Sequence, residues 1–174
     1  DSCLVGSEMC IRDSPYLGFL YAGLMIEGDE IKVLEFNCRF GDPETQPIML
    51  RLESSLTNLC LDAINKKLDA HQIEWSSMHS CGVVLASSGY PEDYETNIEI
   101  DIKNHFSENE KLFHAGTKFI DNKILTSGGR VFCMTALGET LEIAIDNAYN
   151  AIPKINFEGM FFRSDIGKKG LKND

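Results

Sequence analysis

The chain has 174 residues, of which 43% are hydrophobic, so it is long enough to bury a core as one domain or two small ones. Its formal net charge of -11 argues against binding to nucleic acid or to a membrane surface, because both favour basic patches. The six cysteines show no spacing typical of a disulfide framework, and no apolar run has the length of a membrane span, so we expect a cytoplasmic protein.

The first fourteen residues, DSCLVGSEMCIRDS, have no clear periodicity and no basic start or apolar core typical of a secretory signal. They resemble translated sequencing-adapter sequence. We therefore interpret residues 1–14 as a non-native or artefactual leader, and the alternative is a divergent N-terminal strand.

The next segment predicts a hairpin. Residues 18–26 form a compact apolar run that indicates a buried strand, residues 27–30 form a turn, and residues 31–40 form the second strand. Side chains alternate along that second strand, which places an apolar set on one face (Leu34, Phe36, Cys38 and Phe40) and a polar set on the other (Glu35, Asn37 and Arg39).

The polar face of this strand suits one kind of chemistry. Glu35 and Asn37 offer oxygens to a hard cation such as Mg²⁺ or Mn²⁺, which keeps few protein ligands when it also holds phosphates. Arg39 offers a planar guanidinium that can neutralise a phosphate or acyl-phosphate oxygen. The alternative is an amphipathic strand whose polar side chains only face water.

Two helices follow the hairpin. The turn at residues 41–43 leads into a helix over residues 44–52, with Asp42 expected as its N-cap and Pro43 at its first position. Apolar spacing predicts a second helix over residues 56–68 with a core-facing side, capped by Ser54 or Ser55. Residues 71–79 form a polar, linker-like stretch, where we expect a domain boundary.

The remainder of the chain predicts a β-rich segment. Strands are expected at residues 81–86, 112–116, 118–120, 123–126 and 131–136, with a tight hairpin at Asp121-Asn122. Gly128 and Gly129 permit a close backbone approach before the last of these strands. Thr140 caps a helix from residue 141 to about 152, which Pro153 ends, and the tail from Gly167 is expected to fray.

Several motifs carry a resemblance. The stretch RFGDPETQ at residues 39–46 is similar to the signature of the glycinamide ribonucleotide synthetases, the phosphoribosylamine–glycine ligases. The neighbouring segments GFLYAGLM (18–25) and EFN (35–37) also resemble that family. Downstream, the segments ASSGYP (86–91), FHAGT (113–117), GGRV (128–131) and FRSDIG (162–167) follow in the same order. The resemblance extends from about Pro15 to Gly167.

The resemblance implies an α+β fold. It places the C-terminal part of an ATP-grasp domain, built of antiparallel strands and helices, at residues 15–75, and a small β-rich hybrid-type domain with a C-terminal helix at residues 76–170. It also implies a ligase that uses ATP to join glycine to 5-phosphoribosylamine in purine biosynthesis. The nucleotide-binding N-terminal half of such an enzyme has no counterpart in this chain, so we expect this fragment to need that half for catalysis.

The resemblance also implies roles for individual residues. Glu35 and Asn37 would bind the divalent cation that bridges the ATP phosphates, and Arg39 would stabilise the transferring phosphoryl group. Gly41 and Asp42 would lie beside the glycine and acyl-phosphate pocket, although capping alone would explain Asp42. Gly128, Gly129 and Arg130 would approach the ribose phosphate, and a plain turn into a strand is the alternative.

Three other functions remain open from the sequence. The chain could belong to another ATP-grasp carboxylate–amine ligase, although the continuation at residues 41–44 favours the purine enzyme. It could be a carrier or binding module that presents Lys123 at a hairpin tip, but Asn122 and Ile124 stand where biotin carriers have methionines. It could also be a structural fragment whose polar strand has no ligand.

Overall fold

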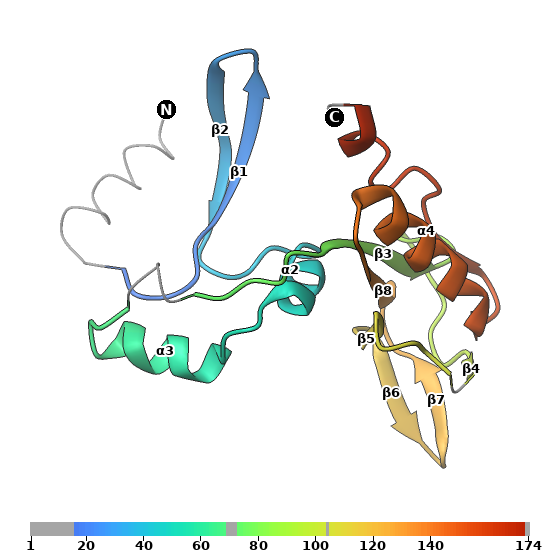
Figure 1. Cartoon of the computed structure of the whole chain (residues 1–174). Helices are drawn as coiled ribbons and strands as arrows, with labels where there is room; N and C mark the ends of the chain where they lie inside the picture. Colours follow the sequence, from blue (N-terminus) through green and yellow to red (C-terminus); the bar gives the residue numbers. More distant parts are fainter. Residues whose placement is uncertain (1–15, 69–72, 104, 173–174) are drawn as a thin grey trace. The chain divides into compact units, whose positions relative to one another are not determined.

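The computed structural model describes residues 16–68, 73–103 and 105–172, so the predicted leader at residues 1–14 lies outside the described part (Figure 1). The chain divides into two compact units. The first contains Asp1–Gly41 and Ser54–Ile73, and the second contains Asp42–Glu53 and Glu74–Asp174. Residues 42–53 therefore lie with the second unit. The predicted domain limits at residues 15–75 and 76–170 remain a prediction about family domains.

The first unit contains the predicted hairpin, formed by β1 (Tyr21–Glu27) and β2 (Glu30–Asn37) in antiparallel pairing. Gly23 pairs with Glu35 and Leu24 pairs with Val33, so Leu34 is an extra residue that forms a β-bulge. The bulge breaks the strict alternation that the sequence predicted. The predicted second strand also ends earlier than expected, because β2 stops at Asn37 and not at Phe40.

The prediction that this hairpin buries an apolar face is wrong for the described residues. Leu24, Ile26, Leu34 and Phe36 are between 47% and 67% exposed. The physical reason is that β1 and β2 form a two-stranded sheet, and within the described part of the chain no third strand extends it. A sheet of two strands can cover little apolar surface by itself.

The two helices after the hairpin belong to different units. Helix α2 (Thr45–Arg51) lies in the second unit and has Glu44 at its N-cap, so the predicted cap at Asp42 is wrong. Helix α3 (Leu56–Ile64) lies in the first unit, and Ser55 caps it as predicted by accepting a hydrogen bond from Asn58 N at 3.4 Å. It ends four residues before the predicted Leu68. None of its residues is fully buried, which corrects the expected core face.

The second unit is built on a four-stranded antiparallel sheet with the order β10-β3-β8-β5. The strands are β3 (His79–Ser87), β5 (Glu110–His114), β8 (Arg130–Gly138) and the short β10 (Met160–Phe161). Strands β6 (Thr117–Ile120) and β7 (Lys123–Thr126) form the predicted hairpin, with positive φ at Asp121 and Asn122. The short strands β4 (Asp101–Ile102) and β9 (Ile155–Asn156) pair with each other.

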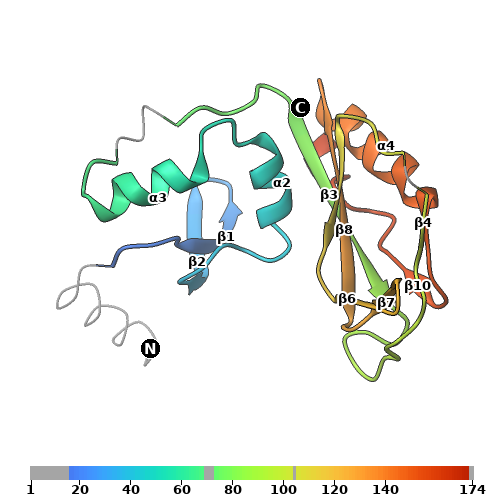
Figure 2. The same cartoon turned by 90° about the horizontal axis from the view of Figure 1, so that it is seen from below.

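Helix α4 (Leu141–Ala151) packs along the sheet beside β3 and β8, and the 3-10 turn η2 (Ile152–Lys154) follows it (Figure 2). Thr140 caps α4 as predicted, since its hydroxyl accepts from Ile143 N at 3.2 Å. The buried core lies between this helix and the sheet. Its fully buried members include Val83, Leu85, Val131, Met134, Ala144 and Ala148. An α+β fold with antiparallel sheets is therefore confirmed.

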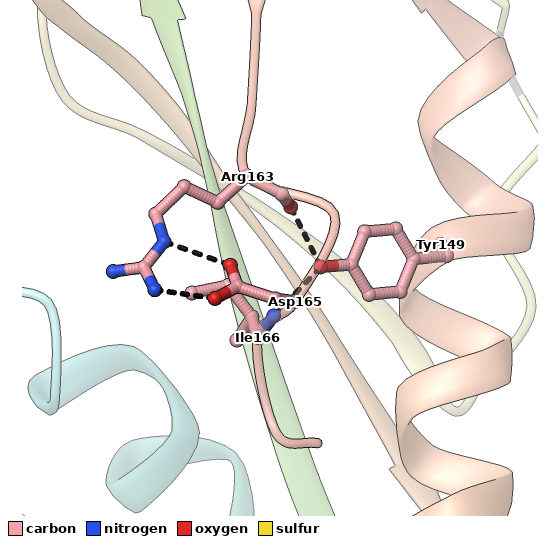
Figure 3. A network of polar contacts seen from close by, with 4 residues as sticks. All are labelled: Tyr149, Arg163, Asp165 and Ile166. Atoms are coloured by element: carbon pink, nitrogen blue, oxygen red, sulfur yellow. Dashed lines mark hydrogen bonds and ion pairs between the residues drawn. The ribbon is translucent and has the colours of Figure 1, made fainter. Parts of the chain in front are cut away.

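The segment after β10 is held against α4. The hydroxyl of Tyr149 donates to the carbonyl of Arg163 at 2.6 Å and accepts from the Ile166 N–H at 3.1 Å. The Arg163 guanidinium donates twice to the Asp165 carboxylate, at 2.9 and 2.7 Å (Figure 3). Beyond Gly167 a further 3-10 turn, η3 (Gly170–Lys172), follows. The motif at residues 162–167 is thus fixed to the helix.

Candidate functional site

The polar face of the hairpin contains two of the predicted ligands. Glu35 and Asn37 lie two positions apart after the bulge, so both side chains leave β2 on one face. Their cross-strand partners on that face are Gly23 and Tyr21. A Cβ atom on Gly23 would lie 3.0 Å from Cγ of Glu35, so the missing side chain gives the carboxylate room. Glu35 is exposed and Asn37 is half-buried, so neither residue is enclosed in the core.

This face fits a cation that takes few protein ligands. Glu35 and Asn37 supply one carboxylate and one amide oxygen. Within the described ranges, no group of three or more His, Cys, Asp or Glu side chains lies close enough to hold a metal ion. A cation bound here would take its other ligands from phosphate oxygens and water, which is the usual habit of Mg²⁺ at nucleotide sites.

Arg39 and Gly41 lie beyond the end of β2. The Nη1 atom of Arg39 donates to the carbonyl of Phe40 at 2.8 Å, so the exposed guanidinium lies along its own backbone. The Phe40 ring stacks on Phe19 with ring centres 3.9 Å apart. Gly41 is buried. Arg39 therefore does not continue the line of Glu35 and Asn37 along a regular strand, although its guanidinium is open to solvent.

Asp42 and Arg130, which are far apart in the sequence, form an ion pair in the second unit. The Nη2 atom of Arg130 lies 2.8 Å from Oδ2 of Asp42. The segment that carries Asp42 is seated on β3, because the Ser80 hydroxyl donates to the Pro47 carbonyl at 3.0 Å. Pro47 also packs on Gly82, where a Cβ atom would lie 2.8 Å from the Pro47 ring. The carboxylate therefore pairs with Arg130 and does not cap α2.

Gly128 and Gly129 make the close approaches that the sequence predicted. A Cβ atom on Gly116 would lie 2.8 Å from Cα of Gly128, so these two backbones touch. A Cβ atom on Gly129 would lie 2.1 Å from the Tyr90 ring. Ser87 ties the neighbouring loop to this turn, since its N–H donates to the Gly129 carbonyl at 2.8 Å and its hydroxyl donates to the Gly128 carbonyl at 3.3 Å.

A second β-bulge lies beside Arg130. Ala86 pairs with Arg130 and Leu85 pairs with Phe132, so Val131 is the extra residue on β8. Bulges re-aim neighbouring side chains and are frequent beside functional sites. Both predicted groups of site residues therefore lie next to a bulge, at Leu34 in the first unit and at Val131 in the second.

Two buried cysteines near this region, Cys81 and Cys133, have raised pKa values. Burial raises the pKa of Cys133, a hydrogen bond with Thr135 opposes this, and the nearby Asp42 carboxylate raises it further. Burial, together with the neighbouring Cys133, raises the pKa of Cys81 to about 11. Since the thiolate is the reactive form, both residues act as apolar packing groups.

Lys123 forms a surface ion pair in the second unit. Its amino group lies 2.6 Å from the Glu99 carboxylate, although the residue follows the hairpin turn as predicted. Open cavities among the described residues of the second unit include one of about 500 Å³ and one of about 650 Å³. Lys123 lines the larger of these, whereas Asp42 and Arg130 line neither.

The structure adds three neighbours to which the sequence assigned no role, Gly23, Tyr90 and Gly116. Gly23 lies in segment 18–25, Tyr90 in segment 86–91 and Gly116 in segment 113–117, and all three segments carried the family resemblance. The family resemblance of these segments was the signal in the sequence that could have identified the three residues. The contacts themselves depend on pairing between distant segments, which the sequence does not reveal.

The family models match in two places. The model "Phosphoribosylglycinamide synthetase, C domain" matches residues 80–169, and the model "Phosphoribosylglycinamide synthetase, ATP-grasp (A) domain" matches residues 5–45. Ten residues of the predicted leader therefore lie inside the second match.

Relatives and a solved structure are similar along most of the chain. The phosphoribosylamine–glycine ligase of Vibrio vulnificus is 50% identical to this chain over 168 residues, and that of Salmonella typhimurium is 50% identical over 169 residues. Each match covers 95% of this chain and 39% of the relative. The crystal structure of the phosphoribosylamine–glycine ligase of Thermotoga maritima is 36% identical, with a TM-score of 0.73, covering 85% of this chain and 36% of that one. The chain thus spans about 39% of the length of these curated relatives.

Proposed function

The chain belongs to the phosphoribosylglycinamide synthetase family, and we propose that it is the C-terminal part of a phosphoribosylamine–glycine ligase. In the proposed reaction the glycine carboxylate takes the γ-phosphoryl group of ATP, which leaves ADP and glycyl phosphate. The amine of 5-phosphoribosylamine then attacks the acyl carbon, and inorganic phosphate leaves. The product, glycinamide ribonucleotide, is an intermediate of purine biosynthesis, and we assign the reaction to the cytoplasm.

The polar face of β2 carries this proposal. Glu35 and Asn37 share one face opposite Gly23, which has no side chain to cover them. We assign these two residues as the protein ligands of Mg²⁺ or Mn²⁺. Such a cation neutralises phosphate charge when it is bound. The residues themselves would fix the position of the ATP phosphates relative to the chain.

Arg39, Gly41 and Asp42 take the roles that the family motif implies. The Arg39 guanidinium is exposed, and its hydrogen bond to the Phe40 carbonyl uses only one of its donors. The remaining donors would stabilise charge on the transferring phosphoryl group. Gly41 and Asp42 would border the glycine and acyl-phosphate pocket, where Asp42 would act together with its partner Arg130.

We assign the ribose phosphate of 5-phosphoribosylamine to Gly128, Gly129 and Arg130. The guanidinium has five N–H donors, and the contact with Asp42 leaves others for a phosphate. The side chain is 39% exposed, so a ligand can reach it. The glycines keep the adjacent backbone free of side chains, which supports close approach of a phosphate.

The domain assignment follows the same reasoning. We assign residues 15–75 to the C-terminal part of the ATP-grasp domain and residues 76–170 to the hybrid-type C-terminal domain. The matches at residues 5–45 and 80–169 support this division. The partner that completes the catalytic site would be the N-terminal half of the same enzyme, because the chain spans about 39% of its relatives.

A chimera tests the proposed reaction. This chain replaces the matching C-terminal segment of the Vibrio vulnificus ligase, with which it shares 50% identity, and glycinamide ribonucleotide formation is measured with ATP, glycine and phosphoribosylamine. We expect turnover by the chimera and none by the 174-residue chain alone. A chimera that folds and binds ATP but forms product only with another amino acid would indicate a different ATP-grasp carboxylate–amine ligase.

A further inference from the structure

We propose that Tyr90 is a positioning residue whose ring holds the Arg130 guanidinium in place for the ribose phosphate. The inference rests on the proposed phosphate-binding role of Arg130 and extends it to a residue on a different segment. In this account the aromatic ring is the essential feature, and the phenol hydroxyl is not.

The ring of Tyr90 fills the space that Gly129 leaves. A Cβ atom on Gly129 would lie 2.1, 2.9 and 3.0 Å from Cδ2, Cε2 and Cγ of this ring. Any side chain at position 129 would therefore displace the ring. Since Gly129 directly precedes Arg130, the ring lies against the backbone from which the guanidinium extends.

The guanidinium is held from two directions. Its Cζ atom lies 5.9 Å from the centre of the Tyr90 ring, which is within the range of a cation–π contact. Its Nη2 atom lies 2.8 Å from the Asp42 carboxylate. A ring contact and one ion pair together restrict a long side chain, yet the ring contact uses none of the N–H donors. Donors that face neither group remain for a phosphate.

The loop that carries Tyr90 is tied to the turn that carries Arg130. The Tyr90 N–H donates to the Ser87 carbonyl at 3.2 Å, and buried Ser87 in turn donates to the carbonyls of Gly128 and Gly129. The Tyr94 ring lies 6.1 Å from the Tyr90 ring. The ring and the guanidinium are therefore fixed in one frame, which is what pre-organised binding requires.

The test is an NMR titration of the 174-residue chain with ribose 5-phosphate, and with inorganic phosphate as a second probe. The variants are Tyr90→Leu, Tyr90→Phe and Arg130→Gln. Phe119→Leu serves as a matched control, because Phe119 is an exposed aromatic residue of the same unit outside this contact. The fluorescence of Trp75, the one tryptophan of the sequence, reports whether the second unit remains folded.

We expect Tyr90→Leu to weaken the affinity for ribose 5-phosphate about tenfold, as the loss of a partly desolvated cation–π contact predicts. The affinity of Tyr90→Phe should stay within about twofold of that of the unmodified chain, because this variant keeps an aromatic ring at position 90. The affinity of Phe119→Leu should stay within the same range, because this variant leaves Tyr90 unchanged. Arg130→Gln should weaken binding more than either Tyr90 variant. The Arg130 Nε–Hε signal should show an upfield ring-current shift that Tyr90→Phe preserves.

The outcomes distinguish the positioning role of Tyr90 from the phosphate site at Arg130 on which it rests. If Arg130→Gln weakens binding but a folded Tyr90→Leu chain does not, the positioning role is wrong and the phosphate site stands. If Arg130→Gln binds as well as the unmodified chain, the phosphate site itself is wrong. A loss in Tyr90→Phe equal to that in Tyr90→Leu would assign the effect to the hydroxyl and overturn the inference. If Tyr90→Leu does not fold, an unshifted Arg130 Nε–Hε signal in the unmodified chain contradicts the proposal.

Discussion

The β1–β2 hairpin and the surroundings of Arg130 hold their functional candidates in different ways. On the hairpin, Glu35 and Asn37 come from one short segment and lie in an exposed two-stranded sheet. Around Arg130, the neighbours come from segments near residues 42, 90 and 129. Arg130 begins β8, and this strand is supported by a buried core. The hairpin site depends on local alternation, whereas the Arg130 region depends on long-range packing. Substitutions should therefore affect the two regions unequally.

The largest difference is expected from one leucine in each region. Leu85 on β3 is fully buried and Leu34 on β2 is 63% exposed. Leu85→Ala should lower the free energy of unfolding by about 3 kcal/mol, because it removes buried methyl groups and leaves a cavity. Leu34→Ala should change it by about 0.5 kcal/mol or less. Urea unfolding followed by circular dichroism measures both, and equal losses would contradict the description of the hairpin as exposed.

A smaller difference is expected from two glycines. Gly129→Ala places a methyl group 2.1 Å from the Tyr90 ring, and Gly23→Ala places one 3.0 Å from Cγ of the exposed Glu35 side chain. Overpacking against the ring should cost about 2 kcal/mol. The Glu35 side chain can rotate away, so Gly23→Ala should cost about 0.5 kcal/mol or less. The same unfolding measurement applies, and a Gly129→Ala chain as stable as the unmodified one would refute the close contact with the ring.

An ion pair in each of the two units gives a smaller, pH-dependent comparison. Burial raises the pKa of Glu110, but hydrogen bonds from Lys154 and from the Ser107 backbone outweigh this and hold the pKa below its ordinary value of 4.5. The Glu110 carboxylate, 12% exposed, lies 2.5 Å from Lys154 Nζ. The pKa of Glu110 is lower in the folded chain than in the unfolded chain. The ionised carboxylate therefore stabilises the fold fully above pH 4.5, and this contribution is lost as the pH falls through the folded pKa.

Glu110→Gln should therefore destabilise the chain by about 1.5 kcal/mol at neutral pH and by less in acid. Glu30→Gln is the matched control on the hairpin, where Glu30 lies 3.5 Å from Lys32 and both side chains are mostly exposed. That exposed pair should contribute about 0.5 kcal/mol or less. Unfolding midpoints measured between pH 3 and 8 give both values, and a Glu110→Gln effect that grew toward low pH would contradict the lowered pKa.

Local patterns predicted the elements well. The hairpin at Asp121-Asn122, the caps at Ser55 and Thr140, and the two strands around the first turn are present near their predicted positions. These features depend on short-range chemistry such as turn conformation and side-chain capping. The exposed hairpin face was not predicted, because alternation identifies an apolar face without identifying what covers it.

The sequence identified candidate residues but not their partners. Asp42 is a residue type typical of helix N-caps and directly precedes Pro43. Its carboxylate nevertheless pairs with Arg130, 88 positions further along the chain. The bulges at Leu34 and Val131 also have no local sequence signal, because they arise from the register of two paired strands. The contact between Gly129 and Tyr90 likewise requires knowledge of which loops meet.

Of the available measurements, the turnover number of the chimeric ligase carrying Glu35→Gln tests the central claim most directly. Glu30→Gln on the same strand provides the same chemical change outside the proposed cation site. We predict that Glu35→Gln lowers the rate of glycinamide ribonucleotide formation by at least about a hundredfold, because it removes a ligand of the cation that would stabilise the transition-state charge. Glu30→Gln should leave the rate within about twofold, as an exposed ion pair predicts. Equal rates for the two variants would contradict the assignment of the β2 polar face as the cation site.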